Sequence, residues 1–174
     1  MSSTLLHRPL LVADVPPKGK RFTIEMSEAE CVEIAKILEL PKVSAVRAEL
    51  DVQHFGEEGL EVRGTIHADV TQTCVVSLDP FDSHQNLDVD IRFSPDGIDP
   101  FDDTVSIEDL VDENAVDPPD KLVDGQIDLG QIVFEFLALG LDPYPRKPGA
   151  VFEEPPAEDE TGPFAALRAL KRDR

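Results

Sequence analysis

The stretch VRAELDVQHFGEEGLEVRGTIHADV, residues 46–70, decides the fold of this chain. Apolar and polar residues alternate on both sides of a Gly-Glu-Glu-Gly sequence at residues 56–59. An alternation with a period of two is typical of half-buried strands, and a short Gly-containing connection between two such runs indicates a hairpin. The stretch therefore predicts a long antiparallel hairpin with one face in water.

The connection of five residues, 55–59, also predicts the register of this hairpin. A slip of one residue would move the apolar set of a strand to the wrong face. The opposite pairs that follow are His54 and Leu60, Asp51 and Arg63, and Leu50 and Gly64. We expect Asp51 and Arg63 to form an exposed charge pair, because residues directly opposite one another lie within reach.

Further strands are predicted on both sides of the hairpin in the sequence. Leu87–Phe93 alternates in the same way, and Leu10–Val12 and Phe22–Glu25 are shorter strand candidates. The alternation slips around residues 72–74, which indicates a bulge or bend. The apolar run Cys74–Leu78 follows directly and ends at an Asp-Pro pair.

A first helix is expected from Ser27 to about Leu40. Ser27 and Glu30 have the spacing of a capping box, and Pro41 ends the helix. The apolar residues expected on its buried side are Val32, Ala35, Ile37 and Leu38.

A second helix is expected in DLGQIVFEFLALGL, residues 128–141, which is apolar almost all round. Asp128 is its expected N-cap, with Gln131 completing a capping box. A helix with almost no polar face is buried on most sides, and this one is shorter than the roughly 20 apolar residues that span a bilayer. Three prolines at positions 143, 145 and 148 then exclude further helix.

Together these elements predict an α+β fold, an antiparallel β-sheet meander with two packed helices. Residues 1–150 are expected to form this single domain, and residues 151–174 an acidic linker with a short basic amphipathic helix. Residues 94–125 contain eleven acidic residues and a single base, Lys121, so we expect an acidic loop excursion there.

The composition narrows the classes of function. The net charge is −20, from 36 acidic against 16 basic residues. This charge argues against a main surface that grips nucleic acid, because such binding needs Lys and Arg to neutralise phosphate. It favours basic partners, or only solubility. The two cysteines are too few for a disulfide scaffold, and the first residues lack a secretory leader. We therefore expect a cytoplasmic protein with free thiols and no membrane segment.

Catalytic and metal chemistry finds little support in the residues. Zinc takes four Cys or His ligands, whereas Cys31 is remote from Cys74 and His67 lies on the polar side of its strand. As a nucleophile, Cys74 would need a base beside it and a lowered pKa. The sequence holds no phosphate loop, dinucleotide fingerprint or nucleophile elbow. We expect no enzyme, cofactor, metal site or small-molecule substrate, and a buried structural role for Cys74, with a thiol- or metal-dependent enzyme as a weaker rival.

Two basic segments are the candidates for contact with a partner or RNA. In the first, Tyr144, Arg146 and Lys147 stand among prolines, where an aromatic ring can stack on a base and cations can pair with phosphate. Alternatively, Tyr144 packs onto the preceding helix and the two cations pair with nearby acids. The second segment has Arg168, Lys171 and Arg172 on one side of a short helix and apolar residues on another. This helix could dock on a partner or fold back onto its own acidic body.

Three stretches resemble a known family. They are QTCVVSLDPF at Gln72–Phe81, the segment Ile127–Ala150, and PFAALRALK at Pro163–Lys171. They are similar to the YceD-like large ribosomal RNA subunit accumulation proteins, formerly a domain of unknown function, and the likeness is strongest from about Arg63 to Lys171. Many of those proteins carry Cys-x-x-Cys where this chain has Cys74 and Ser77.

The resemblance implies a bacterial or plastid accessory factor in large-subunit ribosome biogenesis, needed for accumulation or processing of large-subunit ribosomal RNA, without catalytic residues. Such a factor would act through protein or ribonucleoprotein contacts. The expected partners are a large-subunit ribosomal precursor or basic ribosomal proteins, with at most a local RNA contact. An acidic adaptor or regulatory protein unrelated to ribosomes remains the alternative.

Overall fold

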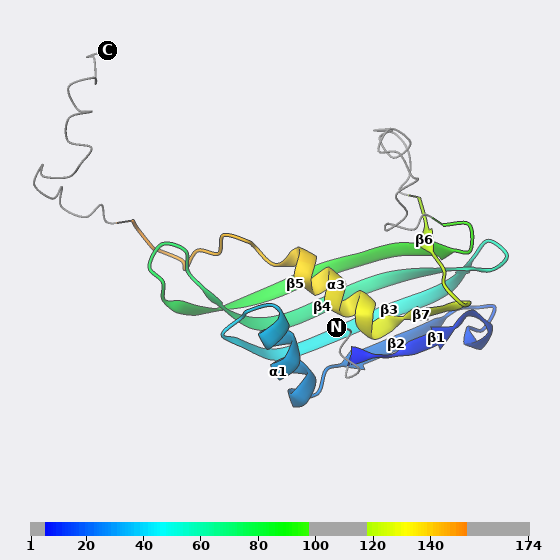
Figure 1. Ribbon diagram of the computed structural model, residues 1–174, viewed down its shortest axis with the longest axis horizontal. Coiled ribbons are helices and arrows are strands. Elements are labelled where there is room, and N and C mark those ends of the chain that lie inside the picture. The colour runs from blue at the N-terminus through cyan, green and yellow to red at the C-terminus, as the bar shows by residue number, and fades with distance from the viewer. Residues whose placement is uncertain (1–5, 98–117, 153–174) are drawn as a thin grey trace, which may run out of the picture.

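The computed structural model describes residues 6–97 and 118–152, and its centre is a five-stranded sheet (Figure 1). The strand order is β2–β3–β4–β5–β6, and every neighbouring pair is antiparallel except β5–β6. The bounds are Lys20–Glu25 for β2, Lys42–Phe55 for β3, Gly59–Thr73 for β4, Pro80–Ser94 for β5 and Asp120–Lys121 for β6. The predicted α+β fold with an antiparallel meander is confirmed, although β5 is much longer than the stretch predicted.

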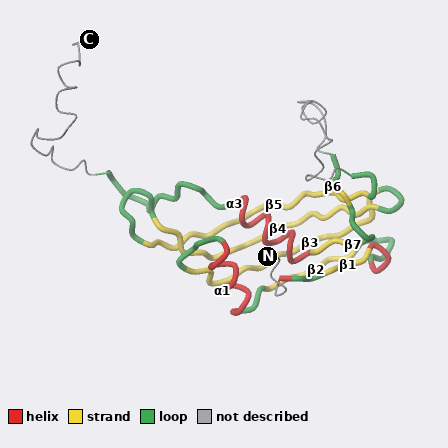
Figure 2. Tube along the Cα trace, viewed as in Figure 1, coloured by secondary structure: helices red, strands yellow, loops and turns green. Residues whose placement is uncertain are grey.

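A small second sheet and two helices complete the described part of the chain (Figure 2). Strand β1, Pro9–Leu11, pairs with β7, Gln126–Asp128, and a short 3-10 helix, Val12–Asp14, follows β1. Helix α1 spans Glu28–Ile37, and α3 spans Leu129–Gly140 and crosses the face of the large sheet. The buried residues of both helices and of the central strands form one hydrophobic core. No helix in the described ranges is long and apolar enough to cross a membrane.

The predicted hairpin register is confirmed, but the predicted charge pair is wrong. All three expected opposite pairs occur, including Asp51 with Arg63. The carboxylate of Asp51 instead accepts hydrogen bonds from Nε and Nη2 of Arg21, at 2.8 and 2.7 Å. Arg63 lies 2.9 Å from Glu61 and 3.3 Å from Asp90. Strand β2 lies on the other side of β3, so Asp51 has a second cross-strand neighbour that the hairpin alone did not reveal.

The irregularity expected at residues 72–74 is a bend and not a bulge. Strand β4 pairs with β5 without a break up to Thr73, and the chain turns at Cys74. Gln72 disturbs the alternation because it is a buried polar residue whose amide donates to the carbonyl of Asp142, 3.3 Å away. The register shift lies in β3 instead, between Val43 and Ala45.

Helix α1 has the predicted capping box, but its buried side differs from the prediction. The side chain of Ser27 accepts from the Glu30 backbone, and Glu30 reaches back to the Ser27 N–H at 2.7 Å. The residues that α1 buries are Glu30, Cys31 and Ile34, whereas Val32 is 64% exposed and Ile37 is also exposed. The helix ends at Ile37, before Pro41, because Glu39 adopts a φ of 54° that α-helix does not allow.

Helix α3 has the predicted N-cap and is less buried than its composition suggests. Asp128 Oδ1 accepts from the N–H groups of Gly130 and Gln131, at 2.9 and 3.1 Å. The side chain of Gln131 donates to Glu135 instead of completing a capping box, so that half of the prediction is wrong. One face is buried, and Leu139 on the opposite side is 84% exposed, because no further layer of the described chain covers it.

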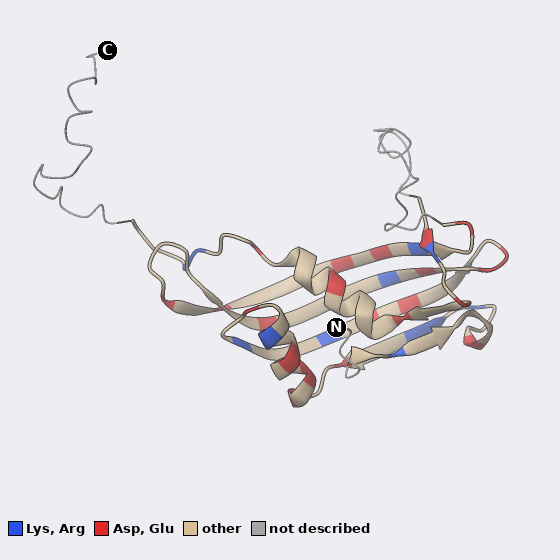
Figure 3. Ribbon diagram, viewed as in Figure 1, with Lys and Arg blue, Asp and Glu red and all other residues tan. Residues whose placement is uncertain are grey.

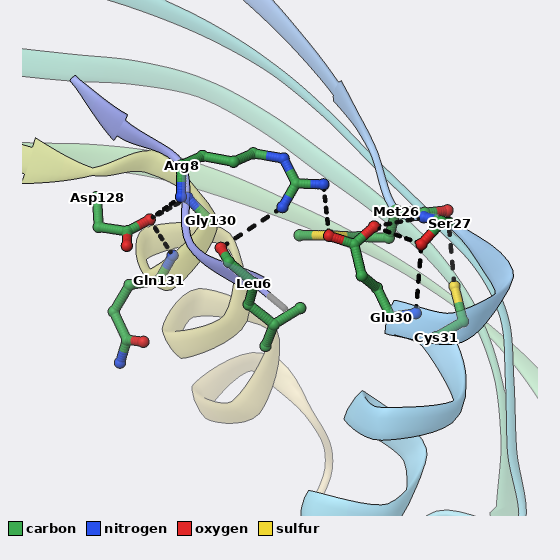
Figure 4. Close-up of polar contacts among 9 residues, drawn as sticks. All are labelled: Leu6, Arg8, Met26, Ser27, Glu30, Cys31, Asp128, Gly130 and Gln131. Atoms are coloured by element: carbon green, nitrogen blue, oxygen red, sulfur yellow. Dashed lines mark hydrogen bonds and ion pairs between the residues drawn. The ribbon is translucent and has the colours of Figure 1, made fainter. Parts of the chain in front are cut away.

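A polar junction built on Arg8 joins the starts of both helices (Figure 4). The backbone N–H of Arg8 donates to the α3 cap, Asp128 Oδ1, at 2.9 Å. Its guanidinium donates to Glu30 Oε1 in the first turn of α1, at 2.6 Å. Between the two, the carbonyl of Leu6 lies where a side chain on Gly130 would begin, so position 130 must be glycine. One N-terminal segment therefore fixes the two helices relative to each other.

The acidic excursion and the C-terminal helix fall largely outside the described residues. Residues 98–117 and 153–174 are not described, so their predicted character stays a prediction. The chain on both sides of the excursion is tied together, because the Leu122 N–H donates to the Ser94 carbonyl at 2.8 Å.

Candidate functional site

The proline segment, residues 142–148, lies against the turn at residues 74–79, which we call the Cys74 turn. The backbone N–H of Val75 donates to the carbonyl of Pro145 at 2.9 Å. Lys147 Nζ lies 3.5 Å from Asp79 Oδ2. Two stretches about 70 residues apart in the sequence are thus held together by backbone and side-chain contacts.

The Cys74 turn is itself a tightly closed loop between β4 and β5. The Cys74 N–H donates to the Asp79 carbonyl, and the Leu78 N–H donates to the Cys74 carbonyl, both at 2.9 Å. Leu78 has a φ of 61°, which is uncommon for a residue other than glycine. The turn holds Leu78 with its side chain 76% exposed.

The sulfur of Cys74 is buried and is the hydrogen-bond centre of the turn. The N–H groups of Val76 and Ser77 each lie 3.4 Å from Sγ. Hydrogen bonds from the hydroxyl and N–H of Ser77, helped by N–H groups of Lys147 and Val76, lower the pKa of Cys74 to about 6, although burial opposes this shift. The expected buried place at a strand end is confirmed. The sulfur is more than a small apolar group, however, because it accepts hydrogen bonds from both segments.

Cys74 lacks the second cysteine of a Cys-x-x-Cys pair. Ser77 stands where Cys-x-x-Cys would put a second thiol, and a hydroxyl is a poor ligand for the metals that thiolates bind. Within residues 6–97 and 118–152, no three His, Cys, Asp or Glu side chains are grouped to hold a metal ion.

The three contact residues predicted in the proline segment are all exposed but differ in their neighbours. Tyr144 is 73% exposed, and its N–H donates to Asp142 Oδ1 at 2.8 Å. Its ring therefore does not pack back onto α3, as one interpretation of the sequence required. Lys147 has the acidic neighbour that the same interpretation foresaw, Asp79, whereas exposed Arg146 makes no ion pair with the described residues. Tyr144 and Arg146 are thus open to a partner.

Sequence reasoning missed the apolar part of this site. Val75 and Leu78 are exposed on the Cys74 turn, next to the proline segment. The sequence showed only an apolar run at Cys74–Leu78, and the structure shows that Val75 and Leu78 within it are exposed. We call Val75, Leu78, Tyr144, Arg146 and Lys147 the contact surface. The remaining candidates, Arg168, Lys171 and Arg172, lie outside the described residues.

The arginines on the wet face of the large sheet are already paired with carboxylates. Lys and Arg are interspersed with Asp and Glu along the strands (Figure 3). Arg21 pairs with Asp51, Arg47 Nη2 lies 2.9 Å from Glu49, and Arg92 Nε lies 2.8 Å from Glu61. These guanidinium groups already have carboxylate partners, so a phosphate would have to compete for them.

The comparison with protein families agrees with the likeness found in the sequence. The model of the family described as "Large ribosomal RNA subunit accumulation protein YceD" matches residues 62–171, more than half of the chain. No curated protein and no solved structure matches the chain. The matched range contains both the Cys74 turn and the proline segment. The chain therefore belongs to the YceD family of large ribosomal RNA subunit accumulation proteins.

Proposed function

We propose that this protein is a non-enzymatic accessory factor in large-subunit ribosome biogenesis, which binds a large-subunit precursor through the contact surface. One observation carries the proposal: two stretches typical of the family, far apart in sequence, meet through the bond between Val75 and Pro145. Their meeting places an exposed aromatic ring, exposed aliphatic side chains and cations on two segments that are fixed to each other.

The chemistry of this surface suits a ribonucleoprotein better than naked RNA. An exposed tyrosine can stack on an unpaired base, and Arg146 can pair with a phosphate. The number of such cations is small, and RNA affinity depends on how many phosphates are neutralised. The carboxylates of a chain with a net charge of −20 attract basic ribosomal proteins instead. We therefore assign the specific contact to the contact surface, and to the carboxylates only a long-range attraction toward the basic proteins of the precursor.

Co-sedimentation of the protein with large-subunit precursors from cells tests this proposal. The variant Tyr144→Ala/Arg146→Ala should fold normally and lose most of its association, because both side chains are exposed and neither supports the core. The control is Lys18→Ala/Lys20→Ala, which removes exposed positive charge far from the contact surface in the sequence. This variant should leave association unchanged.

A third variant separates the contact surface from the acidic excursion. In it, the acidic residues between Asp96 and Asp124 are replaced by Asn or Gln. If association survives the loss of Tyr144 and Arg146 but fails in this third variant, the excursion makes the contact and the proposed surface is wrong. If no variant and no wild-type protein sediments with the precursors, the ribosomal role itself is refuted.

A further inference from the structure

The first half of β3 has an open edge on the side of β2. Strand β2 pairs only with residues 47–52 of β3, and the last contact on this side is the Met26 N–H with the Val46 carbonyl, at 3.0 Å. The chain then leaves the sheet and forms α1. In the described part of the chain, no strand pairs with residues 42–45 on this side. An open strand edge is a template on which another extended chain can pair.

A groove of about 880 Å³ runs along this edge. One wall is the face of α1 that carries Cys31, Val32 and Ala35, and the other is the start of β3 from Lys42 to Val46. Its volume falls in the range of about 300–1,000 Å³ that is typical of binding sites. Val32, with 64% of its surface exposed, presents an aliphatic side chain to this groove.

The two ends of the groove carry different charged residues. Lys36, in the last turn of α1, and Lys42, at the start of β3, line one end, and neither makes an ion pair with a described residue. At the other end, Glu25 lies 3.8 Å from Arg47, and Glu28 in the first turn of α1 makes no ion pair with a described residue, so this end is negative. The charge nearest the open edge at Lys42 is therefore positive, whereas the net charge of the whole chain is −20.

We infer that this groove binds an extended peptide segment of a partner protein, which adds to β3 as a further strand and places a carboxylate between Lys36 and Lys42. Backbone hydrogen bonds to residues 42–45 would supply affinity, and alternate side chains would rest on Val32 and the apolar wall. Four paired residues extend about 13 Å at roughly 3.3 Å each. Acids farther than about 8 Å from the two lysines weaken this attraction little, because charges beyond that distance are largely screened at physiological salt.

Selection from a phage-displayed library of random nine-residue peptides on the immobilised full chain tests the inference. Enriched peptides should share alternating β-branched residues and an Asp or Glu near one end. A synthetic copy of the best one should bind at least ten times more weakly to Val32→Asp and to Lys36→Glu/Lys42→Glu. The matched controls, Ile37→Asp on the same helix outside the groove and Lys18→Glu/Lys20→Glu, should keep wild-type affinity.

Amide hydrogen exchange with and without that peptide locates the binding site. Exchange at residues 42–45 should slow when the peptide binds. Failure to enrich any peptide, equal binding to the Val32 variant, or protection elsewhere would overturn the inference. Light scattering measures whether the protein is a dimer. A dimer that Val32→Asp dissociates would show that a second copy of the chain occupies the groove, and this would also overturn the inference. This inference does not depend on the ribosomal role, so either can fail alone.

Discussion

Replacing Glu30 with Gln removes one negative charge from the junction that joins α1 to the N-terminal segment. The carboxylate accepts from the Ser27 N–H and hydroxyl at 2.7 Å each, and from Arg8 at 2.6 Å. In the variant, the new NH₂ group must face either the Arg8 guanidinium or the Ser27 backbone N–H, and both can only donate. One charge-assisted hydrogen bond is lost, which costs about 1.5–3 kcal/mol. The side chain of Arg8 is 30% exposed and keeps some water, so we expect less than the 3–5 kcal/mol typical of a fully buried pair.

The effect should depend on pH in a defined direction. Burial raises the pKa of Glu30, but the hydrogen bonds from Ser27 and Arg8 together lower it by more than burial raises it. The pKa of Glu30 in the folded protein therefore lies below the ordinary 4.5. A carboxyl group with a lowered folded pKa stabilises the fold above its unfolded pKa, and this stability is lost as the pH falls through the folded value. The difference between wild type and Glu30→Gln should therefore be full at pH 7 and shrink below about pH 4.5.

Thermal and urea unfolding at pH 7 and pH 3 measure this difference. At this chain length, about 1.5–3 kcal/mol corresponds to a fall in Tm of roughly 3–12 °C. Glu28→Gln is the control, because Glu28 lies in the same first turn and is exposed, so it should lose at most the helix-dipole contribution of about 0.3–1 kcal/mol. A Glu30→Gln protein as stable as wild type at pH 7, or a gap of equal size at pH 3, would refute the reasoning.

Four further outcomes follow from the structure. Leu137→Ala should cost about 2–5 kcal/mol of unfolding free energy, because Leu137 is fully buried, whereas Leu139→Ala on the exposed side of α3 should change it little; equal effects in urea unfolding would contradict the observed burial. Arg21→Ala should change the free energy of unfolding little, since its pair with Asp51 is exposed, and a loss as large as that of Leu137→Ala would contradict this expectation. The difference in stability between wild type and Cys74→Ala should widen from pH 6 to pH 9. The lowered pKa of the Cys74 thiol stabilises the folded protein at high pH, and this stability is lost as the pH falls through about 6. A difference that does not change with pH would mean that the pKa of the thiol is ordinary. Elemental analysis of the purified protein should find no stoichiometric zinc, and one zinc per chain that disappears in Cys74→Ser would reverse this expectation.

The sequence predicted correctly those features that depend on residues close to one another in the sequence. The hairpin came out in register because alternation and a short loop are local properties of residues 46–70, and the caps at Ser27 and Asp128 are local as well. The buried side of α1 was not predicted correctly, because the sheet leaves apolar Val32 and Ile37 exposed and its position is not contained in the helix sequence. Local patterns thus predict elements and leave open which faces are covered.

The candidate site was predicted only in part for the same reason. Tyr144, Arg146 and Lys147 stand out because cations and an aromatic residue among prolines form a local pattern. The contact of Pro145 with Val75 joins residues that are far apart in the sequence, so no single stretch of sequence could predict it. The family match includes both stretches without indicating that they touch.

The place of α3 in the chain has a consequence for synthesis of the protein. The hairpin that carries the apolar sheet face is complete at residue 73, but the helix that covers this face ends only at Gly140. Translation at about 5–20 residues per second would take roughly 3–14 s to cover this distance. For that time the side chains of Leu50, Val62 and Ile66, all fully buried in the finished protein, have no cover from α3. The nascent chain should therefore be a client of chaperones that recognise exposed apolar strands until α3 has emerged.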